Sequence, residues 1–136
     1  MSARGKARKR ALDILFESEI RGEPVLDLLA ERSESASPPV PAYAAELVRG
    51  VQEHREQIDE LLAGNARGWT LERMPAVDRN ILRIGAYELF WGADVPDGVA
   101  ISEAVLLAGE LSTDASSAFV NGLLARLLEL RPAADG

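Results

Sequence analysis

Apolar residues along the chain recur three and four positions apart, which is the spacing of one face of an α-helix. The pattern begins near Leu12 and stops at Gly22, and a short second helix follows from Val25. A third run extends from Tyr43 to about Gly64 and predicts one long helix. No segment shows the alternating polarity of a strand, so the pattern predicts an all-α fold.

Residues 76–91 differ from the other segments because apolar side chains cover most of the helix circumference. A helix of this kind is surrounded by its neighbours, so we expect it to be the central element. Further helices are predicted around residues 101–111 and after the serine-rich stretch 112–117. The chain therefore reads as a single-domain bundle of about six to seven helices over residues 1–136, with one clear loop at 33–41.

Asn121 and Gly122 form a dipeptide that is typical of hairpin turns, but they lie within a helical pattern. Phe119 and Leu123 are four residues apart, and no alternation of polarity flanks the dipeptide. A glycine inside a helix costs roughly 1 kcal/mol relative to alanine. We interpret the helical glycines as places where a neighbouring segment approaches the backbone; they are Gly50, Gly85, Gly109 and Gly122.

Charge is distributed unevenly along the sequence. The 136 residues have a net charge of −7, yet the first ten contain five cations and no acid. The rest of the chain has 10 basic and 22 acidic residues, a balance of −12. On a helix these cations would form a surface for phosphates, although a solubilising tail is the alternative. The five are Arg4, Lys6, Arg8, Lys9 and Arg10.

Candidate catalytic groups are scarce. The sequence has no cysteine, and its one histidine, His54, borders an apolar stripe and reads as a packing residue. We find no phosphate-binding loop, dinucleotide fingerprint or nucleophile elbow. No apolar run is long enough for a membrane span, and the N-terminus lacks the apolar stretch of a secretion signal. We therefore expect a cytoplasmic binding protein, not an enzyme, with no cofactor and no metal.

The basic segment by itself is a weak nucleic-acid site. It has few charges and lacks the interleaved aromatic residues that stack on single-stranded bases. The acidic remainder of the chain would repel a polyanion. A second, basic protein bound to the acidic body would remedy both defects, so we predict a binding partner.

The chain resembles the NusB family of bacterial transcription antitermination factors in motifs spread over most of its length. In order these are ELVRGV (46–51), ID (58–59), W (69), VDR (77–79), LRI (82–84), YEL (87–89), DVP (94–96), AISEA (100–104) and FVNGL (119–123). The resemblance implies a non-catalytic helical bundle that pairs with NusE, a small-subunit ribosomal protein. Together they would recognise the boxA element of nascent ribosomal RNA within the transcription elongation complex.

The resemblance also implies roles for individual residues. The basic helix start, Arg4 to Arg10 with Lys6, Arg8 and Lys9, would contact RNA phosphates. A second part of the RNA surface would lie at the start of the last helix, at Ser116, Phe119 and Asn121. The positions facing NusE would be Phe16, Glu72 and Asp78.

The sequence departs from the family pattern in ways that bear on these roles. Gly5 interrupts the basic run, and Ala118 stands where the family often has lysine. Phe16 replaces a common tyrosine, and Ser102 a common asparagine. A charge reversal at Arg8 is expected to weaken RNA binding and to leave the fold intact.

Two other functions fit the same fold. NusB-like domains also position substrates for ribosomal RNA cytosine methyltransferases, but a chain that ends at Gly136 leaves no room for a methyl-donor domain. The second alternative is a structural protein whose main activity is self-association as a homodimer. Glycines such as Gly85 and Gly109 would permit the close approach that a homodimer needs.

Overall fold

The computed structural model describes residues 2–35 and 39–131, and these two ranges contain seven helices and no strand. The all-α prediction is confirmed. The helices are α1 (Ala3–Arg21), α2 (Val25–Ser35), α3 (Ala42–Glu53), α4 (Arg55–Asn65), α5 (Ala76–Trp91), α6 (Asp97–Leu111) and α7 (Asp114–Leu130).

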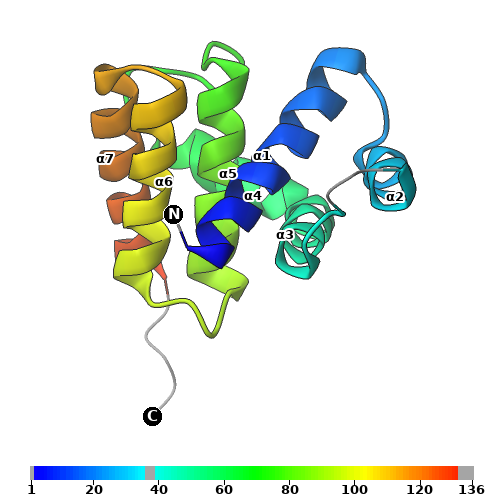
Figure 1. Cartoon of the computed structure of the whole chain (residues 1–136). Coiled ribbons are helices and arrows are strands. Elements are labelled where there is room, and N and C mark those ends of the chain that lie inside the picture. The colour runs from blue at the N-terminus through cyan, green and yellow to red at the C-terminus, as the bar shows by residue number, and fades with distance from the viewer. Residues whose placement is uncertain (1, 36–38, 132–136) are drawn as a thin grey trace.

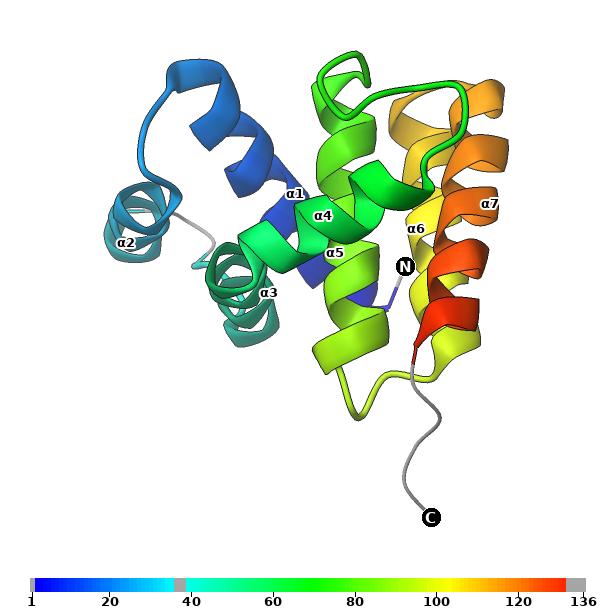
Figure 2. The same cartoon turned by 180° about the vertical axis from the view of Figure 1, so that it is seen from behind.

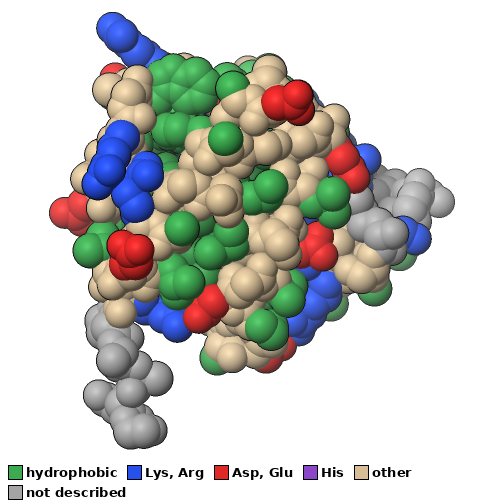
Figure 3. All heavy atoms as spheres, turned by 90° about the vertical axis from the view of Figure 1, so that its left-hand side faces the viewer, with side chains coloured by type: hydrophobic (Ala, Val, Ile, Leu, Met, Phe, Trp, Pro, Cys, Tyr) green, Lys and Arg blue, Asp and Glu red, His purple; other side chains and the backbone are tan. Residues whose placement is uncertain are grey.

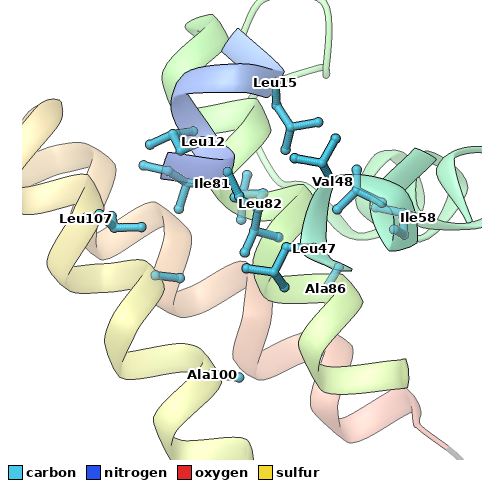
Figure 4. Close-up of a cluster of buried hydrophobic side chains, with 14 of the residues drawn as sticks. Leu12, Leu15, Leu47, Val48, Ile58, Ile81, Leu82, Ala86, Ala100 and Leu107 are labelled. Atoms are coloured by element: carbon cyan, nitrogen blue, oxygen red, sulfur yellow. The ribbon is translucent and has the colours of Figure 1, made fainter. Parts of the chain in front are cut away.

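Helix α5 is the central element, as its apolar circumference predicts. It contacts α1, α3, α4, α6 and α7, and it lies behind α1 and beside α6 and α7 in Figure 1. Seen from behind, α4 crosses in front of it (Figure 2). In Figure 4, Leu12 of α1, Leu47 of α3 and Leu107 of α6 surround Ile81 and Leu82 of α5. All five side chains are almost fully buried, so α5 holds the bundle together.

The helix ends follow local sequence signals. The Ser2 hydroxyl accepts a hydrogen bond from the Gly5 amide (3.0 Å) and caps α1 at its start. The first helix ends at Gly22, as predicted, and Gly22 has a left-handed backbone with φ 68°. Thr113 caps α7 by accepting from the Ser116 amide. None of the described helices combines the length and the apolar character that crossing a membrane requires.

Two helical glycines mark the closest approaches between elements. A Cβ atom at Gly85 would lie 2.7 Å from Cδ1 of Leu124, where α7 packs on α5. A Cβ at Gly50 would lie 2.2 Å from the Tyr87 ring, where α5 packs on α3. The packing interpretation is confirmed at both positions. It is wrong for Gly122, because the nearest atom there belongs to a side chain of the same helix.

The predicted helix from Tyr43 to Gly64 is wrong as a single element, because α3 ends and α4 begins around His54. His54 has φ −104° and ψ 18°, and its ring stacks on that of Trp91 with centroids 4.0 Å apart. This contact comes from α5, so the periodicity of α3 and α4 does not encode it. The packing role expected for His54 is confirmed. In the predicted loop 33–41, α2 continues to Ser35, and residues 36–38 lie outside the described residues.

Candidate nucleic-acid interface

The outer face of α1 carries three solvent-directed cations at its start. Lys6 and Lys9 are exposed and Arg10 is half-buried. At 100° per residue the three positions share one side of the helix. Within the described ranges none of the three forms an ion pair with an acid. The helix N-terminus adds its own partial positive charge, so this face favours anions. We call Lys6, Lys9 and Arg10 the cationic face.

Arg8 points the other way, into the protein. Its Nε lies 2.9 and 3.0 Å from the two carboxylate oxygens of Glu88 on α5, and the side chains are only 3% and 1% exposed. The Tyr43 hydroxyl donates a further hydrogen bond to Glu88. Burial raises the pKa of Tyr43 above its ordinary value, and the bond to Glu88 adds to the shift.

This burial corrects the role expected for Arg8. The side chain ties α1 to α5 and is not free to contact a phosphate in this structure. We therefore expect a charge reversal at Arg8 to destabilise the fold, because a glutamate there would face the buried carboxylate of Glu88.

Arg4 remains at the surface but already has an anionic partner. Its Nη2 lies 2.6 Å from Oδ2 of Asp94, and the two side chains are 44% and 69% exposed. The Arg4 guanidinium also lies over the Tyr43 ring, 4.4 Å from the ring centroid. Such stacking adds a cation–π attraction to the ion pair.

At the start of α7, the structure separates three residues that the sequence grouped together. Phe119 is half-buried and packs edge-on against Trp69, with ring centroids 5.2 Å apart, while Asn121 is exposed. Ser116, in contrast, is 1% exposed, and its hydroxyl donates to Oδ2 of Asp78 at 2.6 Å. Phe119 and Asn121 can reach a ligand, whereas the Ser116 side chain cannot.

The same hydrogen bond changes the role expected for Asp78. Its side chain is fully buried, and within the described residues Oδ1 has no hydrogen-bond partner. Asp78 therefore does not face a partner protein in this structure. It joins the beginning of α5 to the beginning of α7, because Ser116 lies there.

Phe16 and Glu72 do lie near the surface. Arg79 connects the two segments that carry them. Arg79 Nη1 donates to the carbonyl oxygens of Leu71 (2.7 Å) and Met74 (2.9 Å) in the segment before α5. Its Nη2 lies 2.6 Å from Glu19 on α1. Glu72 is thereby fixed on a segment attached to α1, on which Phe16 lies three residues before Glu19.

Sequence reasoning missed Arg79 and Glu19 as builders of this surface. Arg79 belongs to the VDR motif, directly after Asp78, so a signal was present in the sequence. Its partners on α1 and in the 66–75 segment become visible only in the fold.

Glu19 makes the stability of this surface depend on pH. Burial raises the pKa of Glu19, but hydrogen bonds and charges from Arg79 and Arg83 outweigh burial and hold the pKa below its ordinary 4.5. Because folding favours the ionised form, this stabilisation is present above about pH 4.5 and is lost as the pH falls through the lowered value. We expect Glu19→Gln to cost about 1–3 kcal/mol at pH 7 and progressively less as the pH falls through the lowered pKa of Glu19.

Urea unfolding of the wild-type chain and of Glu19→Gln, from neutral to acid pH, measures the difference in their free energies of unfolding. Glu110→Gln, an exposed carboxylate on α6, is the control and should change stability by no more than about 0.5 kcal/mol at any pH. A Glu19→Gln deficit that stayed constant down to acid pH would contradict the ionic origin of the effect.

The cationic face and the start of α7 are separated along α5. Arg8 meets α5 at Glu88, whereas Ser116 meets it at Asp78, ten residues earlier. At 1.5 Å per residue these anchor points are about 15 Å apart. Figure 3 shows the side of the molecule formed by α6 and α7, where Lys and Arg side chains lie in separate groups near the edges. Asp and Glu side chains lie between these groups (Figure 3), so the cations on this side do not form one continuous patch.

Comparison with known proteins places this arrangement in a family. The sequence pattern of the NusB family matches residues 5–129. The chain belongs to the NusB family. It is 58% identical over 130 residues to the transcription antitermination protein NusB of Thermobifida fusca, covering 96% of this chain and 92% of the relative. The Streptomyces coelicolor NusB is 56% identical over 137 residues, covering 97% and 96%. As a member of this family, the present chain functions in transcription antitermination.

Solved NusB structures have the same fold. T. maritima NusB superposes with a TM-score of 0.83 at 32% identity, covering 96% of this chain and 93% of that one. A NusB chain from a crystal structure of the antitermination factors NusB and NusE with double-stranded RNA gives a TM-score of 0.82 at 28% identity, covering 93% and 96%. These comparisons confirm the family resemblance seen in the sequence motifs.

Proposed function

We propose that this NusB-family chain acts as a non-catalytic RNA-binding adaptor, which recognises single-stranded boxA RNA together with NusE. The observation that carries the proposal is the cationic face of α1 on an otherwise acidic chain. None of its three side chains forms an ion pair within the described residues, and the nearest acid on the same side of α1 is Asp13, which interacts electrostatically with Lys9 and Arg10. Lys6, Lys9 and Arg10 would contact consecutive phosphates, and Arg4 would add a fourth contact.

The start of α7 would supply the second part of the RNA surface. Phe119 presents part of an aromatic ring, which can stack on a base, and Asn121 presents an exposed amide, which can hydrogen-bond to a base edge. Arg8 and Ser116 would act indirectly, by holding the helices on which these side chains lie.

NusE is the partner that we propose for the surface around Phe16 and Glu72, which Glu19 supports through its ion pairs with Arg79 and Arg83. An aromatic side chain beside an exposed carboxylate suits a basic protein, and the net acidity of the chain would steer such a protein toward it. A related NusB has been crystallised with NusE and RNA, which supports the assignment of both partners. The pair would act on nascent transcripts in the elongation complex, in the cytoplasm.

Charge reversals on the cationic face test the proposal. We expect Lys6→Glu, Lys9→Glu and Arg10→Glu combined to weaken boxA binding at least about tenfold in the presence of NusE. The slope of log affinity against log salt should fall by about 2, since each phosphate contact on a single strand contributes about 0.7. Fluorescence anisotropy with labelled boxA RNA at several salt concentrations measures both quantities.

The same three reversals made one at a time have a matched control on another helix. Arg49→Glu changes the net charge by the same amount as each single variant, at an exposed position on α3. It should have much less effect than any of the three. Equal losses at Arg49 and on α1 would indicate a general effect of net charge and would remove the cationic face from the proposal.

A further inference from the structure

Asp94 forms an ion pair with Arg4, which within the described residues is the one exposed cation at the start of α1 to have such a pair. Its Oδ2 lies 2.6 Å from Nη2 of Arg4, although the two residues are 90 positions apart in the sequence. The hydrogen bond that Arg4 donates to Asp94 raises the pKa of Arg4 and lowers the pKa of Asp94. The pair is therefore a specific contact between the α5–α6 loop and α1.

The loop that carries Asp94 is held in place by its own backbone. The Val95 amide donates to the Gly92 carbonyl oxygen at 3.0 Å, and the Gly92 amide donates to that of Glu88 at 3.1 Å. Val95 is 5% exposed and anchors the loop in the core, and Pro96 is the N-cap residue of α6. Asp94 is thus presented to Arg4 from a fixed position.

The Arg4 guanidinium also packs on an aromatic ring. Tyr43 lies under its guanidinium at 4.4 Å, and the Tyr43 hydroxyl is itself bonded to the buried Glu88. Arg4 therefore keeps its position whether its outer side contacts a carboxylate or a phosphate. Both Arg4 and Asp94 are open to solvent, so a phosphate can reach this arginine, which is not true of Arg8.

From this geometry we infer that Asp94 is a built-in competitor of RNA, which must leave Arg4 before a phosphate takes its place. The inference rests on the proposed RNA-binding function and adds a residue that sets its strength. The carboxylate mimics the phosphate at the same guanidinium, so RNA gains only the difference between the two contacts. This lowers the affinity of the chain for RNA in general and makes productive binding depend more on the remaining contacts.

Removing the carboxylate charge should therefore tighten RNA binding. Exposed ion pairs contribute about 0.2–1 kcal/mol, which corresponds to an affinity gain of up to about fivefold for Asp94→Asn with boxA RNA and NusE. The salt slope should become steeper by up to about 0.7, because Arg4 becomes a full phosphate contact. In an Arg4→Ala background, Asp94→Asn should give no gain, since nothing remains to be released.

Asp27→Asn is the matched control, because it removes one exposed carboxylate from α2 and changes the net charge equally. A gain at Asp27 as large as that at Asp94, or the same gain with and without Arg4, would overturn the inference in favour of a general field effect. Wild-type binding with no gain in Asp94→Asn would overturn it as well. Absence of binding by the wild-type chain with NusE would instead overturn the proposed function itself.

A titration of the Asp94 carboxyl group by NMR gives a readout without an affinity measurement. Its pKa should rise toward the ordinary aspartate value in Arg4→Ala. In the wild-type chain the pKa should rise in the same way when boxA RNA and NusE are added. An Asp94 pKa that stays low in the RNA complex would show that the carboxylate never leaves Arg4.

Discussion

Replacing Glu88 with alanine is expected to lower the free energy of unfolding by about 3–5 kcal/mol, a large part of the stability of a domain of this size. The substitution leaves the Arg8 guanidinium buried without its carboxylate and removes the acceptor of the Tyr43 hydroxyl. Glu103 is a weaker second partner, because its Oε1 atom lies 3.8 Å from the Arg8 Nη1 atom, beyond hydrogen-bond distance. Urea unfolding followed by circular dichroism measures the change.

Two further variants separate the buried pair from ordinary surface charge. Arg4→Ala breaks the exposed ion pair of the same helix start and should cost less than about 1 kcal/mol. Arg8→Met combined with Glu88→Leu removes both buried charges and should recover most of the loss, because no unpaired ion remains. A Glu88→Ala deficit no larger than that of Arg4→Ala would contradict the structural role of the buried pair.

The second large effect is expected at the contact between α5 and α7. Leu124 is fully buried and lies over Gly85, so Leu124→Ala should leave a cavity and cost about 2–5 kcal/mol. Leu130→Ala, on the same helix but 55% exposed, is the control and should stay within about 0.5 kcal/mol. Thermal and urea unfolding of the two variants give the comparison.

Gly85 provides an internal test of this explanation. By itself, Gly85→Ala places a Cβ 2.7 Å from Leu124 and should destabilise the chain despite the better helix propensity of alanine. In the Leu124→Ala background the same substitution fills part of the cavity and should restore stability. Additive losses in the double variant would show that the two residues do not share one packing contact.

The candidate site could be predicted only in part from the sequence. The cations Arg4, Lys6, Lys9 and Arg10 and the surface positions of Phe119, Asn121 and Glu72 follow from charge, helical spacing and the family motifs, and the structure leaves these residues at least partly accessible. Arg8, predicted with them, is buried. The sequence could not show that Arg4 forms an ion pair with Asp94. The two residues are 90 positions apart along the chain, and nothing in the DVP motif indicates which cation its aspartate contacts.

Helical periodicity determined the helices of this protein and the central place of residues 76–91, because the spacing of apolar residues is a local property of the chain. Periodicity did not predict the break at His54, because the ring of His54 stacks on Trp91 of a different helix. Tertiary structure alone decided which polar residues turn inward. Arg8 and Asp78 are buried because Glu88 and Ser116 complete their ion pair and hydrogen bond from distant helices, and a buried charge is tolerated only where such a partner lies.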